Sequence, residues 1–247
     1  MVNTFGIDRD TLTSANALIP ISLYIFLHKN LKLQNSTTSD VNNVRKIRTW
    51  LAAALINNVF GGQSDQVLTE TLRIIQENHD IKDYPVAQLN EKLKHMNRNT
   101  EIDETTINDF LQIKYNSKEA FLALSLLYEF NDWGTTEFQQ DHIFPRVSFT
   151  PQKMVEMGIS SDRQKTFLKR MNCIGNLELL RTKDEHPTKG GELPGKWISS
   201  RDPDFKVRHL IPTDESLYSF DRFDDFLKER EKLIRKRLES LFSNIEK

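Results

Sequence analysis

The chain has 247 residues, of which 38% are hydrophobic and 28% charged, with a formal net charge of −1. These values exclude a disordered or fibrous protein and indicate one large or two modest domains, each with a real core. Because the net charge is close to zero, no global field draws the chain onto nucleic acid, and any such binding must come from a local patch.

The most apolar stretch, residues 17–27, is too short to span a bilayer and is interrupted by Pro20. No basic segment precedes it and no small-residue cleavage site follows it, so it does not read as a secretion signal. We therefore expect a buried helix, no membrane partner and a cytoplasmic protein. The single cysteine, Cys173, fits a reducing compartment and excludes both a disulfide framework and a multi-cysteine zinc site.

Residues 1–133 are expected to form one helical domain. Apolar residues recur at helical spacing from Val44 to Val59, and Gly61-Gly62 ends that run. The polar residues 34–43 read as a loop. Further helices are predicted to begin at Ser64 and to cover residues 106–113 and 117–130.

A turn-rich segment at residues 131–135 separates this domain from a different pattern. Residues 134–200 hold two short β-like runs with a short helix between them, and residues 185–203 read as a loop. Residues 201–247 are expected to be a helical extension whose last, amphipathic helix packs back on the rest. The fold class predicted is mainly α.

The two β-like runs carry the residues with catalytic potential. Asp141 and His142 precede Ile143 and Phe144 in the first run, and Asn176 lies at the start of the second. Asp184, Glu185, His186 and Lys189 follow within about fifty residues of the first run, and such a set of carboxylate, imidazole and amide groups can hold one hard cation against a phosphodiester.

Each of these residues also has a structural interpretation. His142 could deprotonate a water beside a metal ion, or pack under the turn at Phe144 and Pro145. Asp141 could bind the metal or be a surface strand residue. Asn176 could brace the loop that holds His142 or bond its own backbone. Glu185 and His186 compete to close the metal site, and the sequence favours neither.

Basic residues are in excess near these runs. Residues 163–189 carry seven Lys or Arg against three Asp or Glu. This excess agrees with a surface that binds the phosphate backbone of a nucleic acid, but also with a charged face that contacts only solvent. The candidate phosphate contacts are Arg146, Arg170, Lys183 and Lys189. No Walker A loop, dinucleotide-binding glycine motif or nucleophile elbow is present, and Cys173 is expected in the core.

Two motifs resemble the HNH (His-Me finger) nuclease domain, most closely the C-terminal domain of GmrSD-type, modification-dependent restriction and anti-phage proteins. They are Asp141-His142-Ile143-Phe144-Pro145 and Ile174-Gly175-Asn176-Leu177-Glu178-Leu179-Leu180, followed by Lys189. A weaker likeness to the same family extends over residues 14–20, 48–62, 124–128, 210–212 and 223–230.

The resemblance implies a ββα-metal fold, one Mg²⁺ or Mn²⁺ ion and hydrolysis of a DNA phosphodiester. By position, His142 would be the general base, Asp141 a metal ligand and Asn176 the middle residue that braces the loop. The family usually has an asparagine as its third residue, where this chain has Glu185, with His186 next to it. Since one such site cuts one strand, the expected product is a nick.

Members of that family also carry an N-terminal ParB-like NTPase domain. This sequence lacks the motif of that domain, so we expect the domain to lie outside the chain. The function expected is the nuclease effector of a prokaryotic restriction or anti-phage system acting on DNA, with modified phage DNA as a candidate substrate. The alternatives are a catalytically silent HNH scaffold that binds DNA or protein, and an RNA-directed nuclease.

Overall fold

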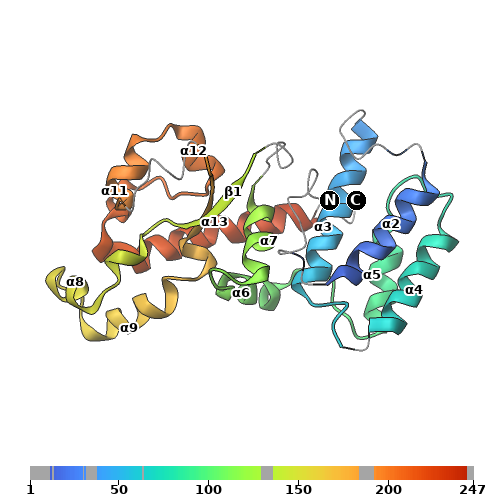
Figure 1. The fold of residues 1–247 in the computed structure, drawn as a ribbon, viewed down its shortest axis with the longest axis horizontal. Helices are drawn as coiled ribbons and strands as arrows, with labels where there is room; N and C mark the ends of the chain where they lie inside the picture. The colour runs from blue at the N-terminus through green and yellow to red at the C-terminus, as the bar shows by residue number, and fades with distance from the viewer. Residues whose placement is uncertain are drawn as a thin grey trace. The chain divides into compact units, whose positions relative to one another are not determined.

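The computed structural model describes residues 12, 14–29, 31, 38–62, 64–128, 136–183 and 192–243. It is mainly helical, which confirms the predicted fold class, and its described residues hold one small antiparallel sheet (Figure 1). The chain forms two compact units, residues 1–107 with 239–247, and residues 108–238. The residues before the sheet, from 108 onward, thus belong to the same unit as the sheet.

The first unit is built from helices whose apolar faces meet. They are η1 (Ala15–Ala17), α2 (Leu18–Leu27), α3 (Thr38–Ile56), α4 (Ser64–Glu77), α5 (Val86–His95) and the start of α6 (Glu104–Gln112). α2 is buried along one face only, because Phe26 is 70% exposed while Ile21 and Tyr24 are buried. Among the described residues, none of the helices is both long and apolar enough to cross a membrane.

The loop predicted over residues 34–43 is wrong for its second half, because α3 already begins at Thr38. Asn43 explains why a polar segment is helical there. Its side chain is buried, donates to the hydroxyl of Tyr24 at 2.7 Å and accepts from the backbone N–H of Tyr84 at 2.9 Å. Tertiary hydrogen bonds thus override the loop preference of asparagine.

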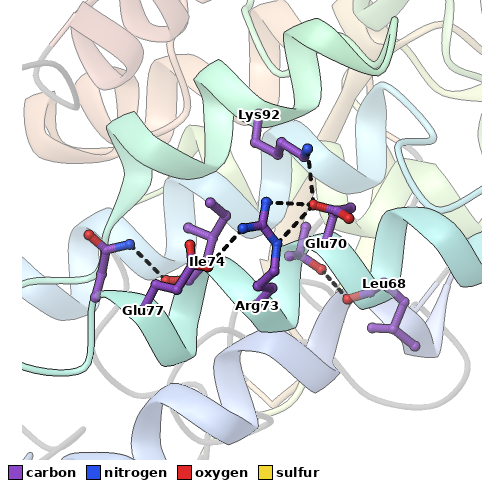
Figure 2. Close-up of polar contacts among 8 residues, drawn as sticks. Leu68, Glu70, Arg73, Ile74, Glu77 and Lys92 are labelled. Carbon is purple, nitrogen blue, oxygen red and sulfur yellow. Dashed lines mark hydrogen bonds and ion pairs between the residues drawn. The ribbon is translucent and has the colours of Figure 1, made fainter.

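Helix α5 has no counterpart in the sequence-based prediction, and ion pairs tie it to α4 (Figure 2). Glu70 of α4 accepts from Lys92 of α5 at 3.0 Å and from Arg73 at 2.9 Å, and Arg73 also pairs with Glu77. The hydrogen bond from Lys92, followed by that from Arg73, lowers the pKa of Glu70. Since these groups face solvent, they orient α5 more than they stabilise it.

Burial raises the pKa of Tyr24 to about 12, against the hydrogen bond from Asn43. The buried phenol stays neutral in the folded protein, whereas in the unfolded chain it ionises at its ordinary pKa of 10. This difference stabilises the folded state fully below pH 10, and the stabilisation is lost as pH rises towards 12. We expect Tyr24 to contribute a loss of up to about 3 kcal/mol in the free energy of unfolding in that window. Urea unfolding at several alkaline pH values measures the loss. Tyr24→Phe should make the dependence shallower without removing it, because burial also raises the pKa values of Tyr84 and Tyr218. An equally steep loss in that variant would contradict the assignment.

Apart from residues 239–243 at the end of α13, which belong to the first unit, the second unit holds the rest of α6 and the remaining elements. They are α7 (Lys118–Leu127), β1 (Phe138–His142), η2 (Arg146–Ser148), α8 (Pro151–Glu156), α9 (Ser161–Arg170), η3 (Ile174–Asn176), β2 (Leu177–Arg181), α11 (Pro194–Trp197), η4 (Ile198–Ser200), α12 (Pro203–Arg208), η5 (Glu215–Tyr218), η6 (Phe220–Arg222) and α13 (Phe223–Ser243). The hydroxyl of Ser117 caps α7 by accepting from Ala120 N–H.

β1 and β2 pair antiparallel, with Phe138 opposite Arg181 and His142 opposite Leu177. The prediction that Ile143 and Phe144 form the first strand is wrong, because the strand ends at His142 and both residues enter the core. The first helix after β2 in the described residues is α11, with four residues. Residues 184–191 lie outside the described part, so the ββα-metal module stays a prediction.

An aromatic cluster forms the core of this unit. Phe223 and Phe226 of α13 lie edge-on to the ring of Phe144, with centroids 5.1 and 5.0 Å apart, and Phe149 and Phe167 pack against the same helix face. Such rings bury large apolar areas in a fixed geometry. The first half of α13 therefore fixes the backbone two residues beyond His142.

Candidate functional site

His142 ends β1 with its imidazole buried to 5% exposure. Its Nε2 lies 2.9 Å from the side-chain oxygen of Asn172. A carboxamide oxygen can only accept, so Nε2 donates in this contact. The ring of Tyr115 lies against the imidazole, with centroids 4.4 Å apart. These two contacts orient the imidazole.

The segment between α6 and α7 covers this region, which the sequence did not predict. The N–H of Tyr115 donates to the carbonyl of Asn172 at 2.7 Å, and Lys114 forms an isolated bridge with Cys173. The Lys114 ammonium lies 2.9 Å from the sulfur of Cys173, which is fully buried as expected. Two segments nearly sixty residues apart therefore hold Asn172 and Tyr115 against His142.

Asn176 is fully buried and bonds the chain just beyond His142. Its side-chain oxygen accepts from Phe144 N–H at 2.9 Å, and its amide donates to the carbonyls of Phe144 at 3.1 Å and Met171 at 2.8 Å. Its own carbonyl accepts from Ile143 N–H at 2.9 Å. The side chain thus braces the loop after His142 rather than closing a turn on its own backbone. Its role in catalysis stays a prediction.

Asp141 and His142 occupy consecutive strand positions, whose side chains leave opposite faces of the sheet. Asp141 is opposite Glu178 in the register, so these two carboxylates share a face. One oxygen of Asp141 accepts from the backbone N–H of His142 at 2.8 Å. Although their Cβ atoms leave opposite faces of β1, the Asp141 carboxylate therefore turns back onto the backbone of His142.

Glu178 belongs to a buried polar network that the sequence analysis missed. Its carboxylate lies 3.1 Å from Nδ1 of His209, and both side chains are at most 1% exposed. The hydroxyl of Tyr128 lies 3.1 Å from the same nitrogen and accepts from Leu179 N–H. Phe205 stacks on His209, with centroids 3.9 Å apart. Glu178 is thus held by an internal partner behind β2.

The candidate phosphate contacts fall in different places. Arg146 is exposed in η2, four residues after His142. Lys183 is exposed and lies two residues after Arg181. The strand register places Arg181 opposite Phe138, four residues from His142, which is about 13 Å at about 3.3 Å per residue. Arg170 forms an ion pair with Glu231 of α13, an internal alternative to the predicted phosphate contact. Lys189 lies outside the described residues.

A metal ion would find one predicted ligand in the described part of the chain, the carboxylate of Asp141, which suits a hard cation. Glu185 and His186 lie outside the described residues. Within the described ranges no three His, Cys, Asp or Glu side chains are grouped so that they could hold a metal. Of the metal ligands that the resemblance implies, the described part of the chain therefore includes Asp141 alone.

No family model matches this chain, and no curated protein matches it in sequence. The candidate site is therefore defined by its own contacts. These are an imidazole oriented by Asn172, a carboxylate at the preceding residue and a loop braced by Asn176. Asn172 and Tyr115 could not be found by motif, because an amide and a phenol are common at surfaces and only the folded chain brings them to His142.

Proposed function

We propose that this protein is a metal-dependent endonuclease that nicks DNA, with the His142 end of the hairpin as its catalytic centre. The observation that carries the proposal is the 2.9 Å bond between Nε2 of His142 and Asn172. In this contact Nε2 donates to Asn172, so Nδ1 is the nitrogen that would accept a proton from water.

In this mechanism Nδ1 of His142 takes a proton from the attacking water, and Asn172 stabilises the resulting imidazolium through its bond to Nε2. Asn176 holds the backbone of Phe144, so the loop after the base does not shift. Asp141, with Glu185 or His186, would hold Mg²⁺ or Mn²⁺. When bound, the ion supplies charge stabilisation for the scissile phosphate and the leaving 3′ oxygen.

Arg146 is the described cation best placed to contact the phosphate backbone, because it is exposed and follows the His142 loop directly. Lys183 would contribute further along the strand direction, and Lys189 stays a candidate from the sequence alone. The role as effector of a prokaryotic restriction or anti-phage system, with a ParB-like NTPase domain as partner, is supported only by the resemblance of residues 141–145 and 174–180.

A second candidate is a silent HNH scaffold that binds DNA without cutting it. The specific observation that favours it is the burial of His142, which is only 5% exposed and packed against Tyr115. The two candidates differ in one assay. Mg²⁺- or Mn²⁺-dependent conversion of supercoiled plasmid to open circles, abolished by EDTA, supports the nuclease. Retardation of DNA in a gel without conversion supports the scaffold.

A further inference from the structure

Arg230 of α13 is completely buried, although arginine is among the residues that are almost never fully buried unless paired. Its guanidinium donates to the carbonyls of Ile174 at 3.1 Å and Gly175 at 2.8 Å, and also to the carbonyl of His209 at 3.2 Å. Ile174 and Gly175 belong to the η3 turn, the same turn that carries Asn176. The Arg230 side chain of α13 thus holds the turn next to the candidate site through hydrogen bonds.

The turn approaches α13 too closely for a side chain at Gly175. A Cβ there would lie 2.9 Å from a carboxylate oxygen of Glu231 and 3.1 Å from a methyl carbon of Leu227. Glu231 also pairs with Arg170, at the end of the helix that leads into the turn. α13 therefore holds the turn through Arg230 and packs closely against Gly175 through Leu227 and Glu231.

Burying a guanidinium is costly, and the structure shows how the charge is balanced. Burial lowers the pKa of Arg230, while the charges of the nearby Tyr128, Glu178 and Glu231 groups act in the opposite direction. An apolar residue of similar volume would avoid this desolvation penalty. An apolar residue could not donate hydrogen bonds to three carbonyls at once. The guanidinium can, because its five N–H donors are held in a rigid, planar fork.

We propose that Arg230 is a positioning residue for His142, which acts by fixing the η3 turn. The chain of contacts is continuous. Arg230 holds the carbonyls of Ile174 and Gly175, Asn176 of the same turn holds the backbone of Phe144, and Asn172 just before the turn holds the imidazole. The effect on catalysis rests on the proposed function, whereas the effect on the imidazole does not.

The test compares Arg230→Lys, which keeps the charge but not the fork, with wild type and Tyr218→Phe. Tyr218 is a matched control, because its buried hydroxyl donates to the carbonyl of Pro212 at 2.6 Å in the same unit without touching η3. All three proteins are compared well below their melting temperatures. The readouts are the imidazole ¹⁵N resonances of His142, which report its tautomer, and kcat and KM for plasmid nicking.

We expect Arg230→Lys to shift His142 from the Nε2–H tautomer to a mixture and to lower kcat about tenfold or more with KM within about twofold. Tyr218→Phe should lose stability and change neither readout. Wild-type resonances and kcat in Arg230→Lys would overturn the inference. If wild type does not nick DNA but the tautomer still responds to Arg230→Lys, the nuclease proposal fails and the positioning role stands.

A second variant covers the case in which Arg230→Lys does not fold. Arg230→Ala leaves a cavity of guanidinium shape, so added guanidinium at a non-denaturing concentration should restore the His142 tautomer and kcat. Methylammonium, a cation without the planar fork, should not restore them. Equal restoration by both cations would show that charge alone is needed, which contradicts a positioning role for the fork.

Discussion

Replacing His142 with alanine is expected to abolish the nicking of supercoiled plasmid in Mg²⁺ or Mn²⁺. Among the described residues at this end of the hairpin, the imidazole is the group whose ordinary pKa lets it accept a proton near neutral pH, and Asn172 orients it. A positioned general base contributes about 10²- to 10⁴-fold, so the variant should lose at least two orders of magnitude in kcat. DNA retardation in gels should change little, since the proposed phosphate contacts are made by other residues.

The matched control is His79→Ala. His79 is 65% exposed, lies in the other unit and contacts only its neighbourhood at Gln76 and Asp80 in the described contacts. This variant should nick like wild type and should be inhibited by EDTA in the same way. A His142→Ala protein that nicks at the wild-type rate would rule out the proposed mechanism. A wild type that binds DNA without nicking would favour the silent scaffold.

Replacing Asn176 with alanine is expected to destabilise the unit of residues 108–238 by about 3–5 kcal/mol. The change leaves three buried backbone groups without their bonds, the N–H and carbonyl of Phe144 and the carbonyl of Met171. Each buried group left unsatisfied costs about 1–3 kcal/mol, and partial relaxation reduces the sum. Urea unfolding followed by far-UV circular dichroism measures the loss, and hydrogen exchange at the Phe144 amide localises it.

Gln152→Ala is the control for that measurement. Gln152 is exposed on α8, and its amide donates to Glu156 at 3.0 Å one turn away. Losing such a pair costs only about 0.2–0.5 kcal/mol. If Asn176→Ala lies as close to wild type as Gln152→Ala, the loop after His142 is held by the aromatic cluster around Phe144 instead, and Asn176 is not its brace.

Several helices could be predicted from the sequence because their burial repeats every 3.6 residues. α4, α6, α7 and α13 lie where apolar spacing or capping residues placed them, and α3 does so apart from its first turns. α5 was missed, and no side chain caps its start at Pro85. β1 is so short that two core residues after its end, Ile143 and Phe144, read as the strand itself.

The candidate site divides in the same way. A local motif nominated Asp141, His142 and Asn176 as candidates, because their types and spacing suit a hydrolase site, and their catalytic roles stay a prediction. The partners of these residues come from distant segments. Asn172 is thirty residues from His142, and Arg230 is more than fifty from the η3 turn. Surface charge likewise suggested a phosphate contact at Arg170, where the fold supplies Glu231.

By itself, then, the sequence determined the helical class of this protein and the identity of the groups able to do chemistry. Both are encoded locally, in apolar periodicity and in residue type. Only the tertiary structure decided how the imidazole of His142 is oriented, how the loop after His142 is braced and why an arginine is buried on α13. These depend on hydrogen bonds between polar residues far apart in the chain, and polar residues carry no periodic signal because their usual place is the solvent.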